Sequence, residues 1–235
     1  MNENSQLSKV DILTIPEDIL KTVYTACRTC YSSEYPVHIW EKDADNEKMQ
    51  KLVKKVIESG HHSTIEHCYV VFSISGVSRA CTHQLVRHRH MSFSQKSQRY
   101  VTETGQFEYI VPPTLKNSAL LDEYNEFMEK ISEFYAKMIE EGIPAEDARF
   151  VLPNAASSSM VASLNLRELI HLANLRLCVN AQLEIRMIVD KMCKLVAEKE
   201  PWLKEYLVPK CEALGYCDEI KCCGRKKQKK EIIPS

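Results

Sequence analysis

Residues 68–76 read CYVVFSISG, and this stretch decides how the rest of the chain is interpreted. Its aromatic and β-branched residues indicate a strand that is central in its sheet. Two segments on its N-terminal side keep helical spacing. One opens at Pro16, and the other spans Met49 to Ile57, with Gly60 placed where a left-handed cap would end it. A short alternating strand over residues 7–13 precedes them.

Beyond residue 76 the pattern stays mixed. FEYIV at 107–111 predicts a strand, and residues 118–141 predict an amphipathic helix closed by Gly142. The predicted apolar stripe of that helix is Leu120, Tyr124, Phe127, Ile131, Phe134 and Met138. A short helix at 144–150 and a break at Pro153 lead to one long helical pattern over 166–198. Without strict βαβ alternation, the elements favour an α+β fold, with a mixed central sheet, flanking helices and a long C-terminal helix in a single domain.

The composition excludes several classes of protein. Net charge is −1, from 31 basic and 32 acidic residues, so no global field draws the chain to nucleic acid or to a membrane surface. No apolar run approaches the roughly 18 residues that a membrane span needs, and the N-terminus lacks a signal sequence. We therefore expect a cytoplasmic protein whose ten cysteines are reduced thiols.

One segment of the chain is basic and free of acids. The 36 residues between Glu66 and Glu103 contain no Asp or Glu, although the chain-wide rate predicts about five. The same segment carries Arg79, Arg87, Arg89, Lys96 and Arg99 among serines, glutamines and histidines. Guanidinium forks and hydroxyl donors suit phosphate oxygens, so a phosphate-bearing ligand is expected here. The alternative is that each arginine pairs with an acid elsewhere in the fold or lies in water.

Within that segment, Arg87-His88-Arg89, followed after seven residues by Ser97, resembles the signature of flavin-dependent thymidylate synthases. Ser92, Ser97 and Arg99 all fall at the spacing of that family. Further segments resemble the family over most of residues 15–205: ACRTCYS near residue 30, GHHSTIEH at 60–67, ARFVLP at 148–153, and the NLR and NAQ elements of the long helical pattern.

The resemblance implies the ligands and the residues that hold them. It implies FAD as cofactor, dUMP as substrate, 5,10-methylenetetrahydrofolate as carbon donor, NADPH as reductant, and a homotetramer with active sites where subunits meet. His61 and Glu66 would lie near the flavin. The implied FAD contacts are Ser63, Arg87, His88, Arg89, Gln95, Asn165, Leu166, Arg167 and His171. The implied nucleotide contacts are Gln84, Leu85, Val86, Arg87, Gln95, Lys96, Ser97, Gln98, Arg99, Arg149 and Arg176.

The implied chemistry assigns the catalytic role to Arg176. Its guanidinium would stabilise negative charge that develops on the uracil ring, and it stays protonated, so it does not act readily as a base. Reduced FAD would then supply the hydride that completes the methyl group. No cysteine occupies the Pro-Cys-His setting of the cysteine-dependent thymidylate synthases, and no base and orienting group are identified that would make Ser97 a nucleophile.

Helix geometry offers a separate check on the shared site. On an ideal helix, Arg167, His171 and Asn174 lie within about 60° of one another, whereas Arg176 points about 180° away from Arg167. If both arginines serve one stacked site, they come from different chains or the helix breaks between them. Closed oligomers are the usual solution to such a requirement.

The sequence also departs from the family. Gln95 stands where many relatives carry glutamate, so it can bond to a ligand but cannot carry charge. The position of Ser94 is often asparagine in the family. Cys30 and Asn180 replace a common serine and histidine, which removes both from the predicted FAD contacts.

Three other classes of function would use parts of this sequence. His61, His62, Glu66 and His67 suggest a metal hydrolase, but neither H-E-x-x-H nor H-x-x-E-H is present. A nucleic-acid-binding module would use the basic segment and the Arg225–Lys230 tail, and it predicts retention on DNA that weakens with salt. The absence of G-x-G-x-x-G argues against a Rossmann dehydrogenase.

The C-terminal cysteines do not match a metal site. Cys211, Cys217, Cys222 and Cys223 follow no standard zinc spacing, and Cys27-x-x-Cys30 lacks a thioredoxin-like context. We predict no metal, a synthase domain over 1–208, and a cysteine-rich, basic tail over 209–235.

Overall fold

The computed structural model describes residues 8–103 and 105–232, which form two compact units. Unit 1 comprises 8–9, 73–87, 93–103 and 105–161, and unit 2 comprises 10–72, 88–92 and 162–232. Within the described residues, no helix combines the length and the apolar character that crossing a bilayer requires.

One four-stranded antiparallel sheet has the order β1-β2-β4-β3. Its strands are β1 (Lys9–Thr14), β2 (Tyr69–Ser78), β3 (Ser92–Gln95) and β4 (Ser157–Asn165). The prediction of a strand at 68–76 in the interior of the sheet is confirmed, and so is the strand near 7–13 within its described residues. The prediction of a mixed sheet is wrong, because every neighbouring pair is antiparallel.

Two strands depart from the sequence-based expectation. Residues 107–111 do not form a strand, and only Tyr109 makes an isolated bridge, to Ala156. Strand β4 was missed, although Ser158, Met160, Ala162 and Leu164 alternate as buried residues along it. Its small serines satisfy the period of two without being strong strand formers, which hid the signal.

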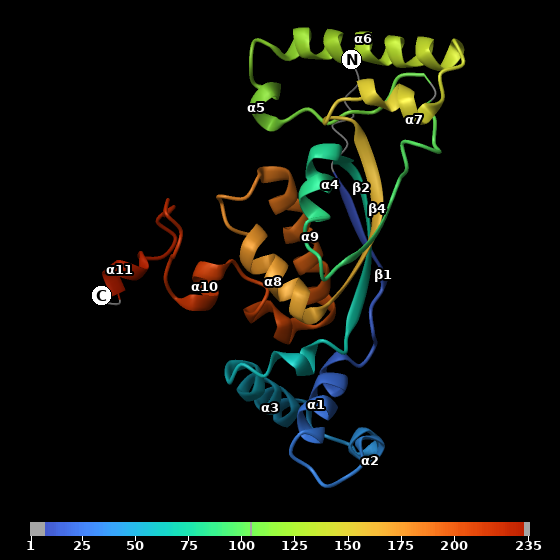
Figure 1. Ribbon diagram of the computed structural model, residues 1–235. Coiled ribbons are helices and arrows are strands. Elements are labelled where there is room, and N and C mark those ends of the chain that lie inside the picture. The colour runs from blue at the N-terminus through green and yellow to red at the C-terminus, as the bar shows by residue number, and fades with distance from the viewer. Residues whose placement is uncertain (1–7, 104, 233–235) are drawn as a thin grey trace. The chain divides into compact units, whose positions relative to one another are not determined.

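Unit 2 holds most of the helices. Figure 1 shows α1 (Ile19–Thr29), α2 (Pro36–Glu41) and α3 (Asn46–Glu58) grouped together, and α8 (Leu166–Arg176) packed on α9 (Leu183–Lys199). The Asp45 side chain caps α3 by accepting from Lys48 N at 3.2 Å, and Gly60 has φ 87° after the helix, as predicted. Shorter elements complete the unit: η1 (His62–Ile65), η3 (Pro201–Glu205), α10 (Lys210–Leu214) and α11 (Lys229–Ile232).

The expected single helix over 166–198 is two helices, so that prediction is wrong. Helix α8 ends at Arg176 and α9 begins at Leu183. No glycine or proline lies between them, so the local sequence gave no stop signal. The Asn180 side chain in the connection donates to Glu219 Oε2 at 3.2 Å and to the Lys221 carbonyl at 3.3 Å, which ties this turn to the C-terminal segment.

The inner faces of α8 and α9 form part of the core of unit 2. Its fully buried side chains include Leu166, Leu169, Leu172, Ile185, Ile188, Val189, Met192 and Val196. Burying each such side chain contributes roughly 1.5–3 kcal/mol relative to exposure, so this face fixes α8 firmly against α9. The residues on the other sides of α8 are therefore held at defined positions.

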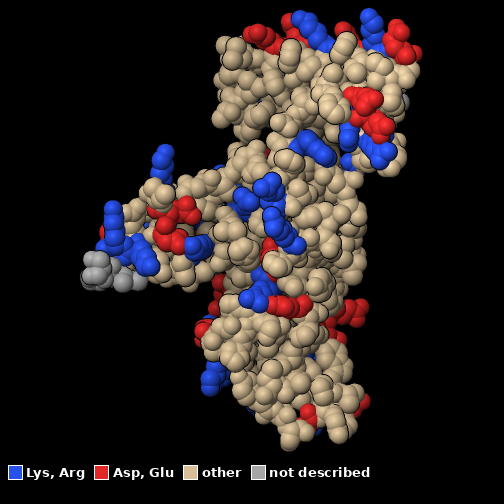
Figure 2. Space-filling view, in the orientation of Figure 1, with Lys and Arg blue, Asp and Glu red and all other residues tan. Residues whose placement is uncertain are grey.

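In unit 1, α6 (Leu121–Glu140) lies alongside α7 (Ala145–Ala148) (Figure 1). Helix α4 (Arg79–Leu85), helix α5 (Pro113–Lys116) and the 3-10 turn η2 (Arg149–Val151) belong to the same unit. Acidic and basic side chains alternate along the outer edge of α6 (Figure 2). Gly142, with φ 82°, follows the helix as predicted.

The apolar stripe predicted for α6 is only partly right. The buried residues are Met128, Ser132 and Tyr135, whereas Phe127 and Phe134 are 58% and 54% exposed. Met128 packs with Phe107 and Ala156, and Tyr124 and Ile131 border this cluster. The buried face of α6 is thus rotated about the helix axis relative to the predicted stripe. It includes Ser132, whose hydroxyl accepts a hydrogen bond from Phe107 N at 2.9 Å.

Candidate active site

The basic segment contains strand β2, helix α4, a turn and strand β3. The Ser78 side chain accepts from Cys81 N at 3.0 Å and caps α4, which ends at Leu85. The chain then turns through Arg87, His88 and Arg89 and enters β3 at Ser92. Residues 79–87 and 93–103 belong to unit 1 and residues 88–92 to unit 2.

In unit 1, the end of α4 carries Gln84, Leu85, Val86 and Arg87. Leu85 is only 1% exposed, so its side chain belongs to the core and only its backbone remains for a ligand. The Val86 amide donates to Thr82 O at 3.0 Å and the Arg87 amide donates to Gln84 O at 3.3 Å. The Arg87 side chain is exposed and has no ion-pair partner among the described residues.

The Gln95 side-chain nitrogen already makes two hydrogen bonds within the protein. It donates to Thr82 Oγ1 at 2.9 Å and to Ser158 Oγ at 3.1 Å. Both donors of the amide are therefore used, and the carbonyl oxygen is left as the group for a ligand. That oxygen can accept from a base N–H or a sugar hydroxyl, but it does not suit a phosphate.

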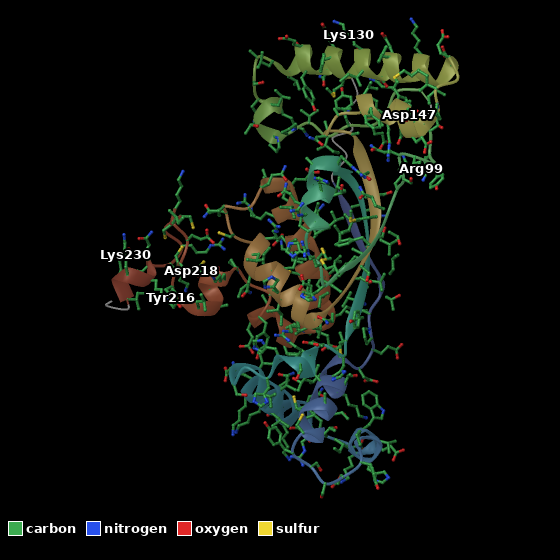
Figure 3. The ribbon with its side chains drawn as sticks, in the orientation of Figure 1. Arg99, Lys130, Asp147, Tyr216, Asp218 and Lys230 are labelled. Atoms are coloured by element: carbon green, nitrogen blue, oxygen red, sulfur yellow. The ribbon has the colours of Figure 1, made fainter. Side chains whose placement is uncertain are left out.

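The residues after Gln95 gather around Glu146 of α7. The Arg99 Nε donates to Glu146 Oε2 at 2.6 Å, and the Arg149 Nε donates to the Glu146 carbonyl at 3.0 Å. Arg99 lies close to the α7 segment that carries Asp147 (Figure 3). Lys96 pairs with Glu103 at 2.6 Å, and Ser97 Oγ accepts from the Arg99 amide at 3.2 Å. Gln98 is half-buried in the same stretch.

Glu146 and Glu103 are residues that sequence reasoning missed. They partly bear out the alternative reading, in which the arginines of the segment pair with acids. Both pairs are partly exposed, and such pairs contribute only about 0–1 kcal/mol. An arriving phosphate could therefore exchange with these carboxylates at small cost.

In unit 2, Ser63, Asn165, Leu166 and Arg167 lie on η1 and at the start of α8, two elements that contact each other. Ser63 is exposed on η1. The Arg167 guanidinium donates to Glu66 Oε1 at 2.5 Å, which joins α8 to the end of η1. Asn165 Oδ1 caps α8 by accepting from Glu168 N at 2.9 Å.

Leu166 cannot offer a side-chain contact. It is fully buried, and its amide donates to Cys68 O at 3.0 Å. His171 and Arg89 are exposed, and Arg89 has no ion-pair partner among residues 8–103 and 105–232. The exposed cations Arg89 and Arg167 and the exposed Ser63 thus remain as groups of unit 2 that suit a pyrophosphate-bearing cofactor.

The centre of this region is His88. It is 7% exposed, and its Nε2 accepts from the Arg176 Nε at 3.0 Å. Its Nδ1 lies 3.3 Å from Glu168 Oε1, and its ring centroid is 6.4 Å from that of His171. Burial, and then the positive charge of Arg176, lower the pKa of His88 below its ordinary value. Glu168 was missed from the sequence, where it reads as an ordinary first-turn acid of a helix.

The geometry settles one of the two alternatives for Arg167 and Arg176. Both lie on α8, which does not break between them, so the alternative of a broken helix is wrong. Arg167 turns to Glu66 and Arg176 turns to His88 on another side of the helix. One straight helix therefore presents the two guanidinium groups in different directions.

The histidines considered for a metal site have other contacts. His61 Nδ1 lies 3.4 Å from the Tyr31 hydroxyl, and His62 Nε2 lies 3.2 Å from Ile57 O. None of the ten cysteines is in a disulfide. Cys178, Cys211, Cys217 and Cys223 line a cavity of about 20 Å³. No group of three or more His, Cys, Asp or Glu side chains in the described residues is arranged to hold a metal ion.

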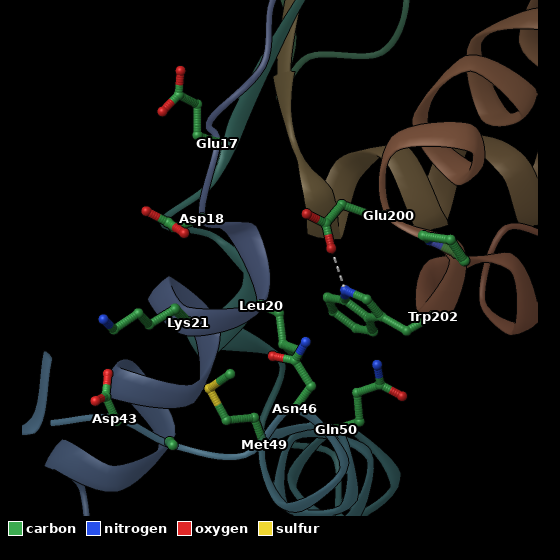
Figure 4. Close-up of a pocket in the computed structure, with 12 residues that line it drawn as sticks. Glu17, Asp18, Leu20, Lys21, Asp43, Asn46, Met49, Gln50, Glu200 and Trp202 are labelled. Carbon is green, nitrogen blue, oxygen red and sulfur yellow. Dashed lines mark hydrogen bonds between the residues drawn. The ribbon is translucent and has the colours of Figure 1, made fainter.

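A larger cavity of about 450 Å³ lies elsewhere in unit 2, between α1, α3 and η3 (Figure 4). Glu17, Asp18, Asp43 and Glu200 line it, and the Trp202 indole N–H donates to Glu200 Oε2 at 2.6 Å. Burial raises the pKa of Glu200. None of the predicted site residues lines this cavity, and its carboxylates do not suit a phosphorylated ligand.

An α+β fold with a buried histidine–arginine contact and exposed cations fits an enzyme that handles an anionic substrate. The family model described as thymidylate synthase complementing protein matches residues 12–202. A flavin-dependent thymidylate synthase of Nitratidesulfovibrio vulgaris is 41% identical, over 92% of this chain and 94% of its own length. One of Pyrococcus abyssi is 37% identical, over 90% and 89%. The chain belongs to the flavin-dependent thymidylate synthase family.

A solved structure supports the fold. The UMP/dUMP methylase PolB of Streptomyces cacaoi, bound with 5-Br dUMP, superposes with a TM-score of 0.73 at 23% identity. The match covers 84% of this chain and 95% of that chain. The two proteins therefore share one fold over most of their lengths.

Proposed function

We propose that this enzyme converts dUMP to dTMP in de novo dTMP biosynthesis, with 5,10-methylenetetrahydrofolate as carbon donor and a hydride that NADPH delivers through FAD. The observation that carries the proposal is the 41% identity to a flavin-dependent thymidylate synthase over 92% of the chain. The match to a fold that binds 5-Br dUMP in a relative supports the choice of nucleotide.

The proposed nucleotide contacts are Gln84, Leu85, Val86, Arg87, Gln95, Lys96, Ser97, Gln98, Arg99, Arg149 and Arg176. Arg99 and Arg149, which share Glu146 as a partner, provide cations for the phosphate, and Ser97 and Arg87 add donors. Gln95 presents its free carbonyl oxygen and is expected to recognise an N–H or O–H of the nucleotide or of FAD. Leu85 and Val86 contribute backbone only, because Leu85 is buried and Val86 is half-buried.

FAD is assigned to Ser63, Arg87, His88, Arg89, Gln95, Asn165, Leu166, Arg167 and His171. The exposed Arg87, Arg89 and Arg167 fit its pyrophosphate, while Leu166 fits only as a neighbour through its backbone. When bound, FAD supplies the hydride that completes the methyl group. The residues of the chain bind and orient the reactants.

Arg176 is the proposed catalytic residue. A guanidinium keeps its proton at any working pH, so Arg176 stabilises negative charge on the uracil ring rather than removing a proton. The bond to His88 uses Nε–H alone. The terminal amino groups of Arg176 are not needed for that bond and can face the substrate.

We propose further that the chain acts as a homotetramer with active sites at subunit interfaces. The opposite directions of Arg167 and Arg176 on α8 support this, because one chain does not aim both at one stacked pair of ligands. Exposed Phe127 and Phe134 on α6 offer apolar surface for assembly. We keep residues 1–208 as the synthase domain, 209–235 as a basic, cysteine-rich tail, and the cytoplasm as location, with no nucleic acid as partner.

The absorption spectrum of the purified protein tests the proposal. We expect an oxidised flavin band that bleaches with NADPH and returns faster when dUMP and methylenetetrahydrofolate are added. A colourless protein that never takes up FAD would reject the function. Salt-sensitive retention on DNA without a flavin band would favour the nucleic-acid-binding alternative.

A further inference from the structure

We propose that Glu168 is a positioning residue for the proposed reaction, which acts through His88 to hold Arg176. This inference rests on the proposed function only for its kinetic part. Its structural part concerns which nitrogen of His88 carries the proton, and that can be measured without turnover.

The three side chains form a connected row inside unit 2. Glu168 stands in the first turn of α8 with a side chain 7% exposed, and the His88 side chain is 5% exposed. Glu168 Oε1 lies 3.3 Å from His88 Nδ1, and His88 Nε2 lies 3.0 Å from Arg176 Nε. His88 comes from the turn before β3, so the row connects the basic segment to both ends of α8.

The location of the protons follows from the bonding capacities of these groups. A guanidinium can only donate, so His88 Nε2 must accept and carries no proton. A neutral imidazole has one N–H, which then lies on Nδ1 and points to Glu168. Glu168 is the acceptor that selects this tautomer, because without it the buried Nδ1–H would lose its partner.

Protonated His88 would break this row. It would place an N–H of its own against the Arg176 Nε–H. The groups that face the ring are Glu168, Arg176 and His171, of which Glu168 favours the proton and the other two oppose it. Burial adds to the opposition and is the largest cause. The neutral ring with Nδ1–H is therefore the form that keeps Arg176 in place.

A purely structural role for Glu168 is the competing explanation. A carboxylate in the first turn of a helix is favourable to the helix dipole, and the Glu168 amide bonds to Asn165 at 2.9 Å. An exposed acid would serve that purpose equally well. A buried carboxylate is costly unless charge or hydrogen bonds balance it, and here the balance comes from His88 and, beyond it, Arg176.

Three variants of the full-length enzyme separate these roles. Glu168→Ala removes the acceptor, Glu168→Gln keeps an oxygen at the same reach, and Glu198→Gln makes the same chemical change at an exposed position of α9. For each, FAD content, thermal midpoint, kcat, and KM for dUMP are measured. We expect Glu168→Ala to lower kcat by about 10- to 100-fold with bound FAD and KM little changed, Glu168→Gln to lose less, and Glu198→Gln to match wild type.

Nitrogen NMR of ¹⁵N-histidine-labelled protein gives the readout that needs no turnover, with His88→Gln to assign the signals. Wild type should show His88 with a protonated Nδ1 and a bare Nε2, and Glu168→Ala should lose that pattern. An unchanged His88 tautomer in Glu168→Ala overturns the inference. So does loss of FAD and of folding stability in step with kcat, which would mark a structural role. If wild type itself fails to make dTMP, the proposed function is wrong. The NMR result still shows whether Glu168 selects the tautomer of His88.

Discussion

At the scale of single residues, the chemistry depends on how Arg176 is held. Replacing it by Ala should leave FAD bound, because Arg176 is not itself among the proposed FAD contacts. Thymidylate formation should fall by at least about 10²-fold, since one preorganised electrostatic group is lost. Single-turnover oxidation of the reduced flavin with dUMP and methylenetetrahydrofolate measures this. Lys199→Ala, exposed at the end of α9, is the control, and unchanged turnover in Arg176→Ala would remove that residue from the mechanism.

His88 should make stability depend on pH. Its folded pKa is lowered, mainly by burial and then by Arg176, so the unfolded chain takes up its proton first, near pH 6.5. The free energy of unfolding should therefore fall as pH drops through that value, and stop falling once folded His88 protonates. Above that range both states are neutral and the contribution vanishes. Urea unfolding of wild type and His88→Gln between about pH 7.5 and 5 should show the steeper loss in wild type; parallel curves would contradict it.

At the scale of elements, α6 carries neighbouring aromatic residues on a buried face and on an exposed face, so their contributions to stability can be compared. Tyr135 is 1% exposed and its hydroxyl accepts from Glu103 N at 3.4 Å, whereas its neighbour Phe134 is 54% exposed. Tyr135→Ala should destabilise the protein by about 3 kcal/mol or more, and Phe134→Ala by about 1 kcal/mol or less in the unassembled chain. Denaturant unfolding at low protein concentration measures both, and equal losses would mean that the inner face of α6 is assigned wrongly.

The elements also show what the sequence could and could not predict. Helices with caps or terminal glycines, such as α3 and α6, were predicted close to their observed bounds because their stop signals are local. The division between α8 and α9 was missed because it depends on Asn180 meeting Glu219 and Lys221, which are distant in sequence. That the basic segment holds a ligand stays a prediction, and its pairing with Glu146, 47 residues from Arg99, depends on tertiary structure. Glu168 was missed for the same reason, since only the fold buries it beside His88.

At the scale of the whole molecule, the proposed tetramer makes a composite site, and two inactive variants can test it. If Arg167 and Arg176 reach one site from different chains, Arg167→Ala and Arg176→Ala should each be inactive alone. Mixed tetramers should regain intact sites, because some sites then take Arg176 from the first variant and Arg167 from the second. For random one-to-one assembly, about a quarter of the sites should be restored.

The experiment requires co-expression with two different tags and tandem purification, followed by turnover per bound FAD. A matched mixture of Arg176→Ala with wild type calibrates the share of intact sites. Recovery in the doubly tagged hybrid, but not in a mixture of separately purified variants that do not exchange subunits, assigns the two arginines to different chains. If no hybrid recovers activity while each retains FAD and assembles normally, one chain supplies both groups. Helix α8 would then have to bend between Arg167 and Arg176 when the ligands bind, because its straight form points the two guanidinium groups in different directions.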